Sequence, residues 1–420
     1  MKKHAPKPSA KSAPAAVTPR RPSTLDPQPA TVLLAITGMS PAVLTETIWA
    51  LAQETPPVIP SRVIVVTTAQ GRGCLGQLFK TAPRFGGLSP WDALRQALEA
   101  QGHSLKGRLR FGQTADDIRV ITAHDRATDR SVELPDLRNL ADNEATADFL
   151  LEQVRSLVEN PDTDLVVSLA GGRKTMGALL YACLTLAGRE TDRLTHVLVS
   201  EPFETLREFW FPGQPGGPLQ PPARFAGPVP AAHAAAAALH PATAHVELAT
   251  VPFVPLRNLF VRELGRKPGT FSGLVAACRV SVRQRAAEHL RVALDPARRE
   301  LEVTGQSVKL APLEQLLLLF LATRAKHGAP AFGAYAEAVD ALNAFREQQL
   351  ADRPKDDFGD WRHADSLRAN WDEQDIRKAV SNLRARLRQR GGDLAAFAAC
   401  LPEKGRCSLD LPGPLIHLKA

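Results

Sequence analysis

Short apolar runs alternate with amphipathic stretches from Thr31 onward, and this alternation constrains the fold more than any other feature of the sequence. TVLLAIT begins at Thr31, an amphipathic stretch runs from Pro41 to about Gln53, and RVIVVTT follows it. The order predicts a strand, a helix and a second strand. Because two strands joined through a helix run in the same direction, the pattern indicates a parallel sheet.

A second unit of the same kind lies further along the chain. The strands DLVVSLA (164–170) and THVLVS (195–200) flank a predicted helix from about Lys174 to Ala187, and the sheet is expected to resume within 245–257. The Pro-, Gly- and Ala-rich stretch 212–244 is predicted to be a flexible insertion. We therefore expect residues 31–270 to form an α/β, Rossmann-like domain with a mainly parallel sheet that helices cover on both faces.

Positive charge is concentrated at the two ends of the chain. The 420 residues allow two or three domains and carry a formal net charge of +8. Residues 1–30 hold six Lys or Arg against the single Asp26, a net charge of +5, and they offer little to bury, so we predict a disordered basic tail. Residues 31–270 sum to −1 and residues 271–420 to +4. The basic C-terminal third permits nucleic-acid binding without requiring it.

Cysteine usage and hydropathy argue against several classes of protein. The five cysteines are odd in number and show no CxxC spacing, so neither a disulfide framework nor a zinc site is suggested. No apolar run approaches the roughly 18 residues that cross a bilayer, and the N-terminus lacks the apolar segment of a secretory signal. We expect a cytoplasmic protein.

The first motif with chemical potential is ITGMSPAVLTET, where the first strand gives way to a helix. Ser40 before Pro41 is a common helix opening, with Ser as the N-cap and Pro as the first helical residue, and this structural interpretation stays open. The functional interpretation is that the free N–H groups of the helix receive a phosphate at the carboxyl end of the strand, with Ser40 hydrogen-bonded to the ligand.

The second motif, VVSLAGGRKTMGALLYA, places two glycines and two cations where another strand passes into another helix. Gly171 and Gly172 let backbone approach a ligand closely, and Arg173 and Lys174 supply donors beside a helix N-terminus. A turn after a buried strand needs one glycine, so the combination favours a phosphate site. A mononucleotide P-loop would require a glycine at position 168, which is Ser, and ATP hydrolysis is disfavoured.

These two motifs, TGMSP and SLAGGRKTM, resemble those of the CARF domains of CRISPR-associated proteins, with the closest likeness to the ring nuclease branch. The resemblance covers about residues 31–260. It implies a homodimer that binds cyclic oligoadenylate, the second messenger of type III CRISPR systems, across its two-fold axis. The implied ligand-binding residues are Thr37, Gly38, Met39, Gly171, Gly172, Arg173, Thr175 and Met176.

The resemblance also implies a reaction that uses no metal and no cofactor. The ribose 2′-hydroxyl attacks the adjacent phosphorus and leaves a linear product with a 2′,3′-cyclic phosphate, with cyclic tetra-adenylate as the expected substrate. The implied catalytic residues are Ser40, which would orient the ribose or phosphate, and Lys174, which would neutralise charge in the transition state. Neither motif contains a His that could act as a base.

Beyond residue 270 the pattern changes. A linker helix is expected at 271–290, and residues 291–420 are expected to form an α+β winged helix-turn-helix domain. LRVALDPARRELEVTGQSVKL is predicted to be a hairpin turning at Asp295 and Pro296. The predicted helices span Pro312–Lys326, 331–349 and 372–390, and a second hairpin is expected around Gly405.

The helix 372–390 resembles the DNA-reading helix in the winged-helix domains of response-regulator transcription factors. Candidate DNA-binding residues on its polar face are Arg377, Lys378, Asn382, Arg384 and Arg388. The alternative is that these residues only keep a solvated helix soluble. The acidic segment DRPKDDFGDW, which contains Asp352 and Asp360, would sit unfavourably beside phosphates if it lay on the same face.

Three hypotheses therefore stand: a ring nuclease, a DNA-binding regulator that senses cyclic oligoadenylate, and a ligand-activated ribonuclease. The third depends on Arg283 and His289, which fit the loose R-x5-H pattern of the HEPN ribonucleases. Those domains are helical throughout, whereas strand-like residues follow at 291–309. We favour the ring nuclease because both Ser40 and Lys174 are present.

Overall fold

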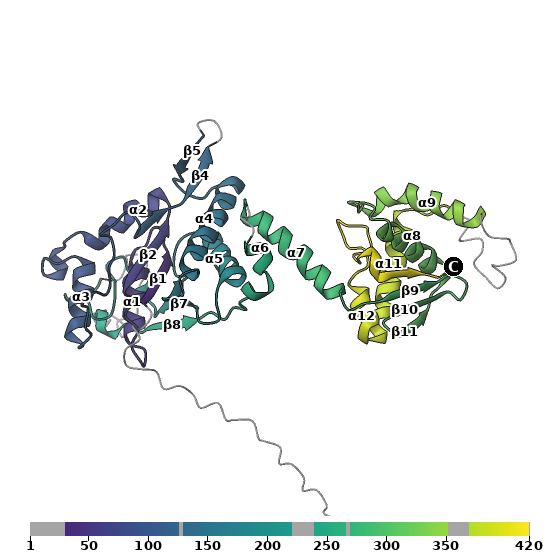
Figure 1. Cartoon of the computed structure of the whole chain (residues 1–420). Coiled ribbons are helices and arrows are strands. Elements are labelled where there is room, and N and C mark those ends of the chain that lie inside the picture. Colours follow the sequence, from purple (N-terminus) through teal and green to yellow (C-terminus); the bar gives the residue numbers. More distant parts are fainter. Residues whose placement is uncertain (1–29, 126–128, 221–238, 266–268, 352–368, 420) are drawn as a thin grey trace, which may run out of the picture. The chain divides into compact units, whose positions relative to one another are not determined.

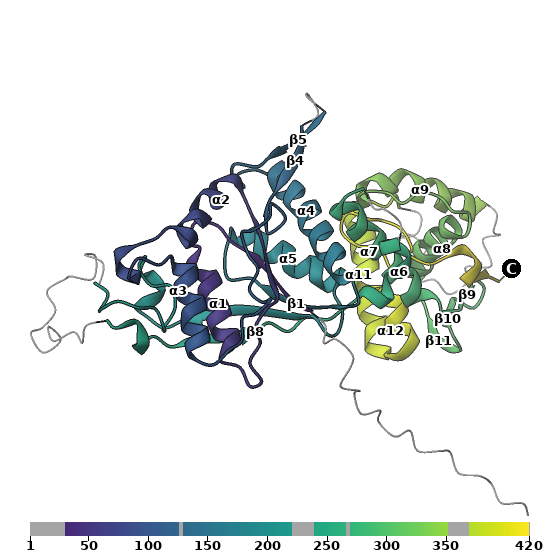
Figure 2. The same ribbon diagram turned by 60° about the vertical axis from the view of Figure 1, so that its left-hand side comes forward.

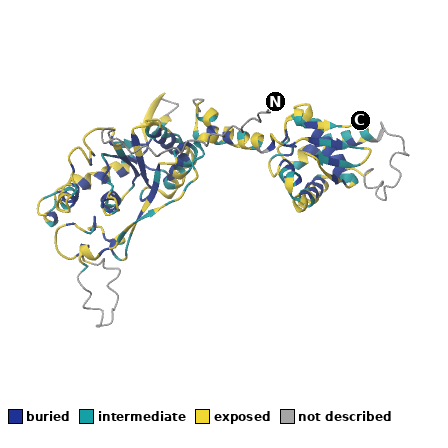
Figure 3. Cartoon of the chain, turned by 60° about the horizontal axis from the view of Figure 1, so that its bottom comes forward, coloured by how far each residue is buried: buried dark blue, intermediate teal, exposed yellow. Residues whose placement is uncertain are grey.

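The computed structural model describes residues 30–125, 129–220, 239–265, 269–351 and 369–419 (Figure 1). The predicted basic tail and most of the predicted 212–244 insertion lie outside these residues, as do Asp352, Asp356, Asp357 and Asp360. Contacts divide the chain into two compact units, residues 1–259 and 260–420. Figure 3 shows that each unit has its own buried residues.

The first unit contains a mainly parallel sheet with the strand order β3-β2-β1-β6-β7-β8. Its strands are β1 (Ala30–Ile36), β2 (Arg62–Thr67), β3 (Ile118–Val120), β6 (Thr163–Ser168), β7 (Arg193–Val199) and β8 (Val246–Thr250). The edge strand β8 runs antiparallel to β7, and the other pairs are parallel. The expected α/β, Rossmann-like fold is confirmed.

Helices cover both faces of this sheet, as the unbroken burial along β1 requires. Leu33 and Ala35 of β1 pack into one core with Leu44 and Ile48 of the first helix. On the other face α4 and α5 pack against each other, and Figure 2 shows them apart from α1 and α3. The helices are α1 (Ala42–Ala52), α2 (Ala69–Leu75), α3 (Pro90–Ala100), α4 (Leu140–Val158) and α5 (Lys174–Ala187).

A two-stranded hairpin, β4 (Thr122–Asp125) and β5 (Arg130–Glu133), follows β3 and projects beside α2 and α4 in Figure 1. No sequence pattern indicated this hairpin. Its base is held to the start of α2, because the Ala69 amide donates to the Leu134 carbonyl at 2.9 Å and the Gln70 amide to the Pro135 carbonyl at 3.2 Å. The chain that leaves this hairpin therefore runs along the carboxyl edge of the main sheet.

The second unit is α+β. Its strands are β9 (Val292–Asp295), β10 (Glu300–Val303), β11 (Gln306–Lys309) and β12 (Ile416–Leu418), in the order β11-β10-β9-β12. Its helices are α6 (Val261–Gly265), α7 (Phe271–Ala287), α8 (Pro312–Lys326), α9 (Tyr335–Ala351), α11 (Glu373–Arg390) and α12 (Gly392–Ala398). Leu317 of α8, Val380 of α11 and Leu301 of β10 share its core.

One prediction for this unit was incomplete. We expected residues 291–309 to form two strands, but the second half is itself a hairpin of β10 and β11. Thr304 (φ 47°) and Gly305 (φ 85°) both adopt left-handed backbone, which closes a tight turn between the two strands. Close to the C-terminus Glu403 and Arg406 form a second tight turn through paired backbone hydrogen bonds of 3.0 Å.

Candidate functional site

The carboxyl ends of β1 and β6 lie side by side in the middle of the sheet. The chain leaves β1 towards β2 and leaves β6 towards β7, so the direction of the strand order reverses between β1 and β6. In open parallel sheets the loops at such a reversal separate and leave a crevice in which ligands bind. Both motifs found in the sequence follow these two strands.

The two motif loops are in contact through their glycines. A Cβ added to Gly171 would lie 2.5 Å from the Ile36 carbonyl oxygen and 3.0 Å from the Thr37 Cα, and one added to Gly38 would lie 3.2 Å from the Gly172 Cα. Gly172 also has a φ of 73°, which favours glycine. Packing and backbone conformation thus account for both glycines, and the expectation that this turn needs only one is wrong.

In the first loop, hydrogen bonds fix the backbone and leave Ser40 exposed. The Thr37 hydroxyl donates to the Ser40 carbonyl at 3.2 Å, and the Thr67 hydroxyl donates to the Thr37 carbonyl at 2.8 Å. No side chain caps the first turn of α1. Within the described residues the Ser40 hydroxyl makes no hydrogen bond, and the neighbouring Met39 side chain is also exposed.

In the second loop, Lys174 and Thr175 begin α5 with exposed side chains, while Met176 is buried. Arg173, which precedes the helix, has the extended backbone usual before a first helical turn and an exposed side chain. Lys174 makes no ion pair in the part of the chain that the structure describes. It is therefore a cation available to a ligand at a helix N-terminus.

Arg173, in contrast, is paired. Its Nε lies 3.0 Å from the Asp136 Oδ1, and its Nη2 donates to the Asp136 Oδ2. Asp136 follows the β4–β5 hairpin, and its carboxylate also accepts the Leu137 amide at 2.8 Å and lies 3.4 Å from the Arg138 Nε. The hydrogen bonds from Arg173 are the main reason that the pKa of Asp136 falls to about 2.

A cleft of about 340 Å³ lies between the two motif loops and the Asp136 segment. Its lining comes from the loops after β1, β2 and β6, the first turns of α2 and α5, and the segment after β5: Thr37, Gly38, Met39, Thr68, Gln70, Gly71, Asp136, Arg138, Gly172, Arg173 and Met176. Of the residues proposed from sequence, Ser40, Gly171, Lys174 and Thr175 lie outside this lining.

Sequence reasoning missed the contributions of the loop after β2 and of the segment after β5. Thr68 and Gln70 could have been found, because β2 neighbours β1 and its carboxyl end must lie at the same edge. Asp136 and Arg138 follow an unpredicted hairpin, and Asp136 is 37 residues before Arg173, so no local pattern pointed to them.

Among the described residues, no cluster of at least three His, Cys, Asp or Glu side chains is placed to hold a metal ion. None of the described helices is long and apolar enough to cross a membrane.

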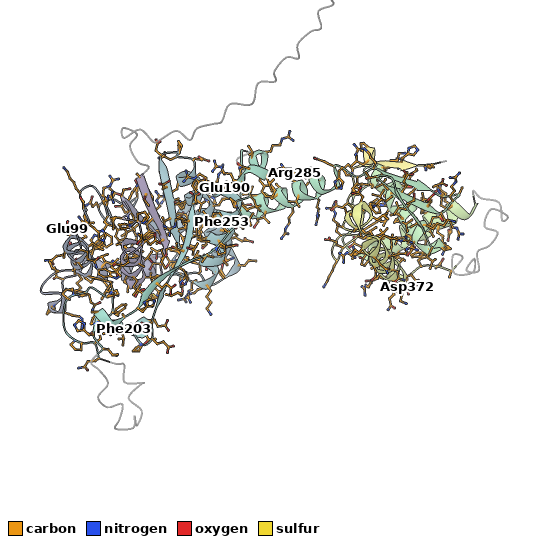
Figure 4. The ribbon with its side chains drawn as sticks, turned by 90° about the horizontal axis from the view of Figure 1, so that it is seen from below. Glu99, Glu190, Phe203, Phe253, Arg285 and Asp372 are labelled. Carbon is orange, nitrogen blue, oxygen red and sulfur yellow. The ribbon has the colours of Figure 1, made fainter. Side chains whose placement is uncertain are left out.

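In the second unit the candidate DNA-binding residues differ in their contacts. Figure 4 labels Asp372, which caps the N-terminus of α11. Lys378, Asn382 and Arg388 are exposed on α11. Arg377 is paired with Glu373 in its own helix, and the Arg384 guanidinium donates to the Leu401 and Pro402 carbonyls at 3.1 and 2.6 Å. Arg384 therefore holds the segment before the 403–406 turn.

Arg283 and His289, the candidate ribonuclease pair, have separate partners. The Arg283 Nε lies 3.2 Å from the Asp410 Oδ2, and the His289 Nε2 lies 3.5 Å from the Asp393 Oδ1. Strands β9, β10 and β11 follow α7, as the sequence indicated. The all-helical architecture of a HEPN domain is absent from this part of the described chain.

Comparison with known proteins identifies one family. The model described as CRISPR-associated protein NE0113 matches residues 40–277, which are more than half of the chain and include the loop after β6. The structure aligns with Csm6 of Enterococcus italicus bound to cyclic hexa-2'-fluoro-hexa-dAMP, at 12% identity and a TM-score of 0.28, over 88% of this chain and 79% of that chain. A TM-score this low supports no functional argument. No curated protein matches the sequence.

Proposed function

Since the chain belongs to the family of CRISPR-associated protein NE0113, we propose that it is a CARF-domain ring nuclease that binds and cleaves cyclic oligoadenylate. The supporting observation is the contact of the two motif loops at the point where the strand order reverses. This contact brings the N-termini of α1 and α5 to one edge of the sheet, where the side chains of Ser40, Lys174 and Thr175 are exposed. Free N–H groups and the positive end of the helix dipole stabilise bound phosphate.

A dimer suits such a ligand. Two copies of the edge, related by a two-fold axis, would present Lys174 and Arg173 twice around one ring of phosphates. Cyclic tetra-adenylate has matching symmetry, and we propose it as the substrate.

The chemistry we propose requires alignment and charge stabilisation. The 2′-oxygen of one ribose forms a bond to the adjacent phosphorus, the bond from phosphorus to the 5′-oxygen breaks, and the 5′-oxygen gains a proton while the 2′-hydroxyl loses one to solvent. Ser40 would orient the ribose or phosphate through its exposed hydroxyl, which makes no hydrogen bond to the described residues. The Lys174 ammonium would neutralise charge that accumulates on the phosphate oxygens in the transition state.

The test is incubation of the full chain with labelled cyclic tetra-adenylate in the presence of EDTA. We expect linear products that end in a 2′,3′-cyclic phosphate, and Lys174→Ala should lower the rate by about 100-fold or more, as removal of one transition-state donor commonly does. Lys106→Ala is the matched control, because Lys106 is an exposed lysine far from the motif loops. It lies in the loop before Leu109, whose amide donates to the Pro60 carbonyl at the opposite edge of the sheet. Tight binding with an intact ring would reject the enzyme.

That outcome would favour a second candidate, a DNA-binding regulator that senses cyclic oligoadenylate. The exposed Lys378, Asn382 and Arg388 on α11, together with the 403–406 turn, support a winged helix that reads DNA. The measurement is retention of the chain's own promoter DNA across a salt series, with and without cyclic tetra-adenylate. Absence of binding at low salt counts against this candidate.

A further inference from the structure

Two arginines at the rim of the cleft share one buried carboxylate. Asp136 has a side-chain exposure of 8%, whereas Arg173 and Arg138 are 58% and 76% exposed. Arg173 uses its Nε and one terminal nitrogen to bind Asp136, and Arg138 uses its Nε. Because a guanidinium has five N–H donors, both arginines keep donors that face solvent. The cluster carries two positive charges against one negative charge.

The backbone around this cluster is anchored on both sides. The segment before Asp136 is hydrogen-bonded to the first turn of α2 through Ala69 and Gln70. The amide of Arg138 donates to the Asp142 Oδ2 at 2.9 Å, within the capping box that begins α4. The Arg138 backbone is therefore fixed, and its side chain is directed by Asp136.

Stability alone gives a weak reason for this arrangement. Arg173 alone would suffice to pair the buried Asp136, and the 3.4 Å contact of the exposed Arg138 contributes little to folding. A guanidinium held in place by a carboxylate on one edge can present its other edge to a phosphate, and a fork of N–H groups matches two phosphate oxygens. Both arginines line the same cleft as the motif loops.

We propose that Arg138 is a phosphate-binding residue of the ligand site, and that Asp136 is the positioning residue that holds Arg138 and Arg173 side by side. The inference rests on the proposed function, because it takes cyclic oligoadenylate as the ligand. Beside Arg173 of the second motif, it adds to the cleft a second cation, Arg138, which belongs to neither motif.

The first experiment measures binding of labelled cyclic tetra-adenylate and cyclic hexa-adenylate across a salt series. Arg138→Ala should weaken binding by about tenfold and lower the slope of log K against log salt by about 0.7, as expected when a single-stranded ligand has one fewer neutralised phosphate. Arg138→Lys should fall between wild type and Arg138→Ala, because lysine keeps the charge without the fork. Arg108→Ala, an exposed arginine beside the control lysine, should bind as wild type does.

The second experiment uses Asp136→Asn. A role in offsetting charge and a role in positioning the arginines predict opposite changes in the affinity for the ring. If Asp136 only offsets positive charge, its neutralisation leaves the cleft more positive and tightens binding. If it positions the arginines, binding weakens despite the added positive charge. Asp164→Asn, on an exposed residue near the amino end of β6, is the matched removal of one negative charge. Should Asp136→Asn fail to fold, Asp136→Glu keeps the negative charge and displaces the carboxylate, so it should weaken binding only if Asp136 positions the arginines.

The outcomes separate the inference from the function. If the wild type binds the ring and Arg138→Ala binds it with the same affinity and the same salt slope, the proposed role of Arg138 is wrong, while the proposed function stands. Unchanged or tighter binding by Asp136→Asn, or wild-type binding by Asp136→Glu, overturns the positioning role. If the wild type binds neither ring, the proposed function fails, and the inference fails with it.

Discussion

At the scale of single residues, Gly171 connects the two halves of the site through backbone contact. A methyl group there would meet the Ile36 carbonyl and the Thr37 Cα, and neither atom can move without disturbing β1. We predict that Gly171→Ala lowers the free energy of unfolding by roughly 1–3 kcal/mol through overpacking. Urea titration of the full chain measures it.

Gly73→Ala is the control for this substitution. Nothing lies within 4 Å of the added methyl group, and Gly73 is inside α2, so alanine should be neutral or stabilise by roughly 0.5–1 kcal/mol. Equal effects of the two substitutions would refute the close contact between the loops.

Glu46 is a buried carboxyl group of α1 that makes no hydrogen bond within the described residues. Burial, and then the charge of Glu204, raises the pKa of Glu46 from 4.5 to about 8. The native state holds this proton more tightly than the unfolded state does. Below pH 4.5 the carboxyl group is neutral in both states, so it does not lower the free energy of unfolding. The first unit loses stability as pH rises through about 8.

The test is Glu46→Gln, which keeps the shape and removes the titration. We predict a melting temperature close to wild type at pH 5 and higher than wild type by roughly 5 °C at pH 9, measured by circular dichroism. A pH-independent difference between the two proteins would show that Glu46 is already ionised at pH 5.

At the scale of helices and strands, α11 combines residues that hold the unit together with residues that are free to bind. We predict that Arg384→Ala destabilises the second unit by about 1–3 kcal/mol, because it removes charge-assisted hydrogen bonds to the Leu401 and Pro402 carbonyls. Arg388→Ala should change the free energy of unfolding by less than about 0.5 kcal/mol, as an exposed substitution.

Guanidinium denaturation followed by circular dichroism compares these two variants. Promoter binding then gives an independent comparison, since only Arg388→Ala would weaken DNA binding without a loss of stability. Equal stability of the two variants would show that Arg384 is free in solution and belongs with the candidate DNA-binding residues.

The sequence predicted most of these elements because their signals are local. The bounds of α5 match the expected Lys174–Ala187, and α11 begins one residue after the expected start, since apolar residues at helical spacing mark both helices and Asp372 caps α11. The hairpin β4–β5 escaped prediction because its short, exposed strands carry no comparable apolar signal, and the turn at Thr304 lies inside a segment that the sequence predicted to be a single strand. The arrangement of Asp136 and Arg138 depends on that hairpin and could not be derived.

At the scale of the whole molecule, the described residues of each unit pack around a large apolar core of their own. Leu33, Leu44 and Val65 belong to the first, and Leu301, Leu317 and Val380 belong to the second. Since each unit buries its own apolar residues, we predict two calorimetric transitions for the full chain. A single transition that unfolds both units together would contradict this division.

The ligand should distinguish the two transitions. A ring that binds only the native first unit stabilises that unit by about 2.7 kcal/mol at a free concentration 100 times Kd, which corresponds to a shift of roughly 5–10 °C. We predict that cyclic tetra-adenylate raises this transition and leaves the other in place, as expected for a nuclease whose C-terminal unit does not respond to the ligand. Saturating ligand in the calorimeter provides the measurement, with Lys174→Ala used to prevent turnover.

A shift of both transitions would carry a different meaning. A ligand can stabilise the second unit only if the two units exchange free energy, so parallel shifts would demonstrate coupling between the ring site and α11. That coupling is what a DNA-binding regulator requires and what a ring nuclease can lack. Repeating the scan with promoter DNA in place of the ring makes the test reciprocal, because DNA bound to a coupled second unit must then raise the transition of the first.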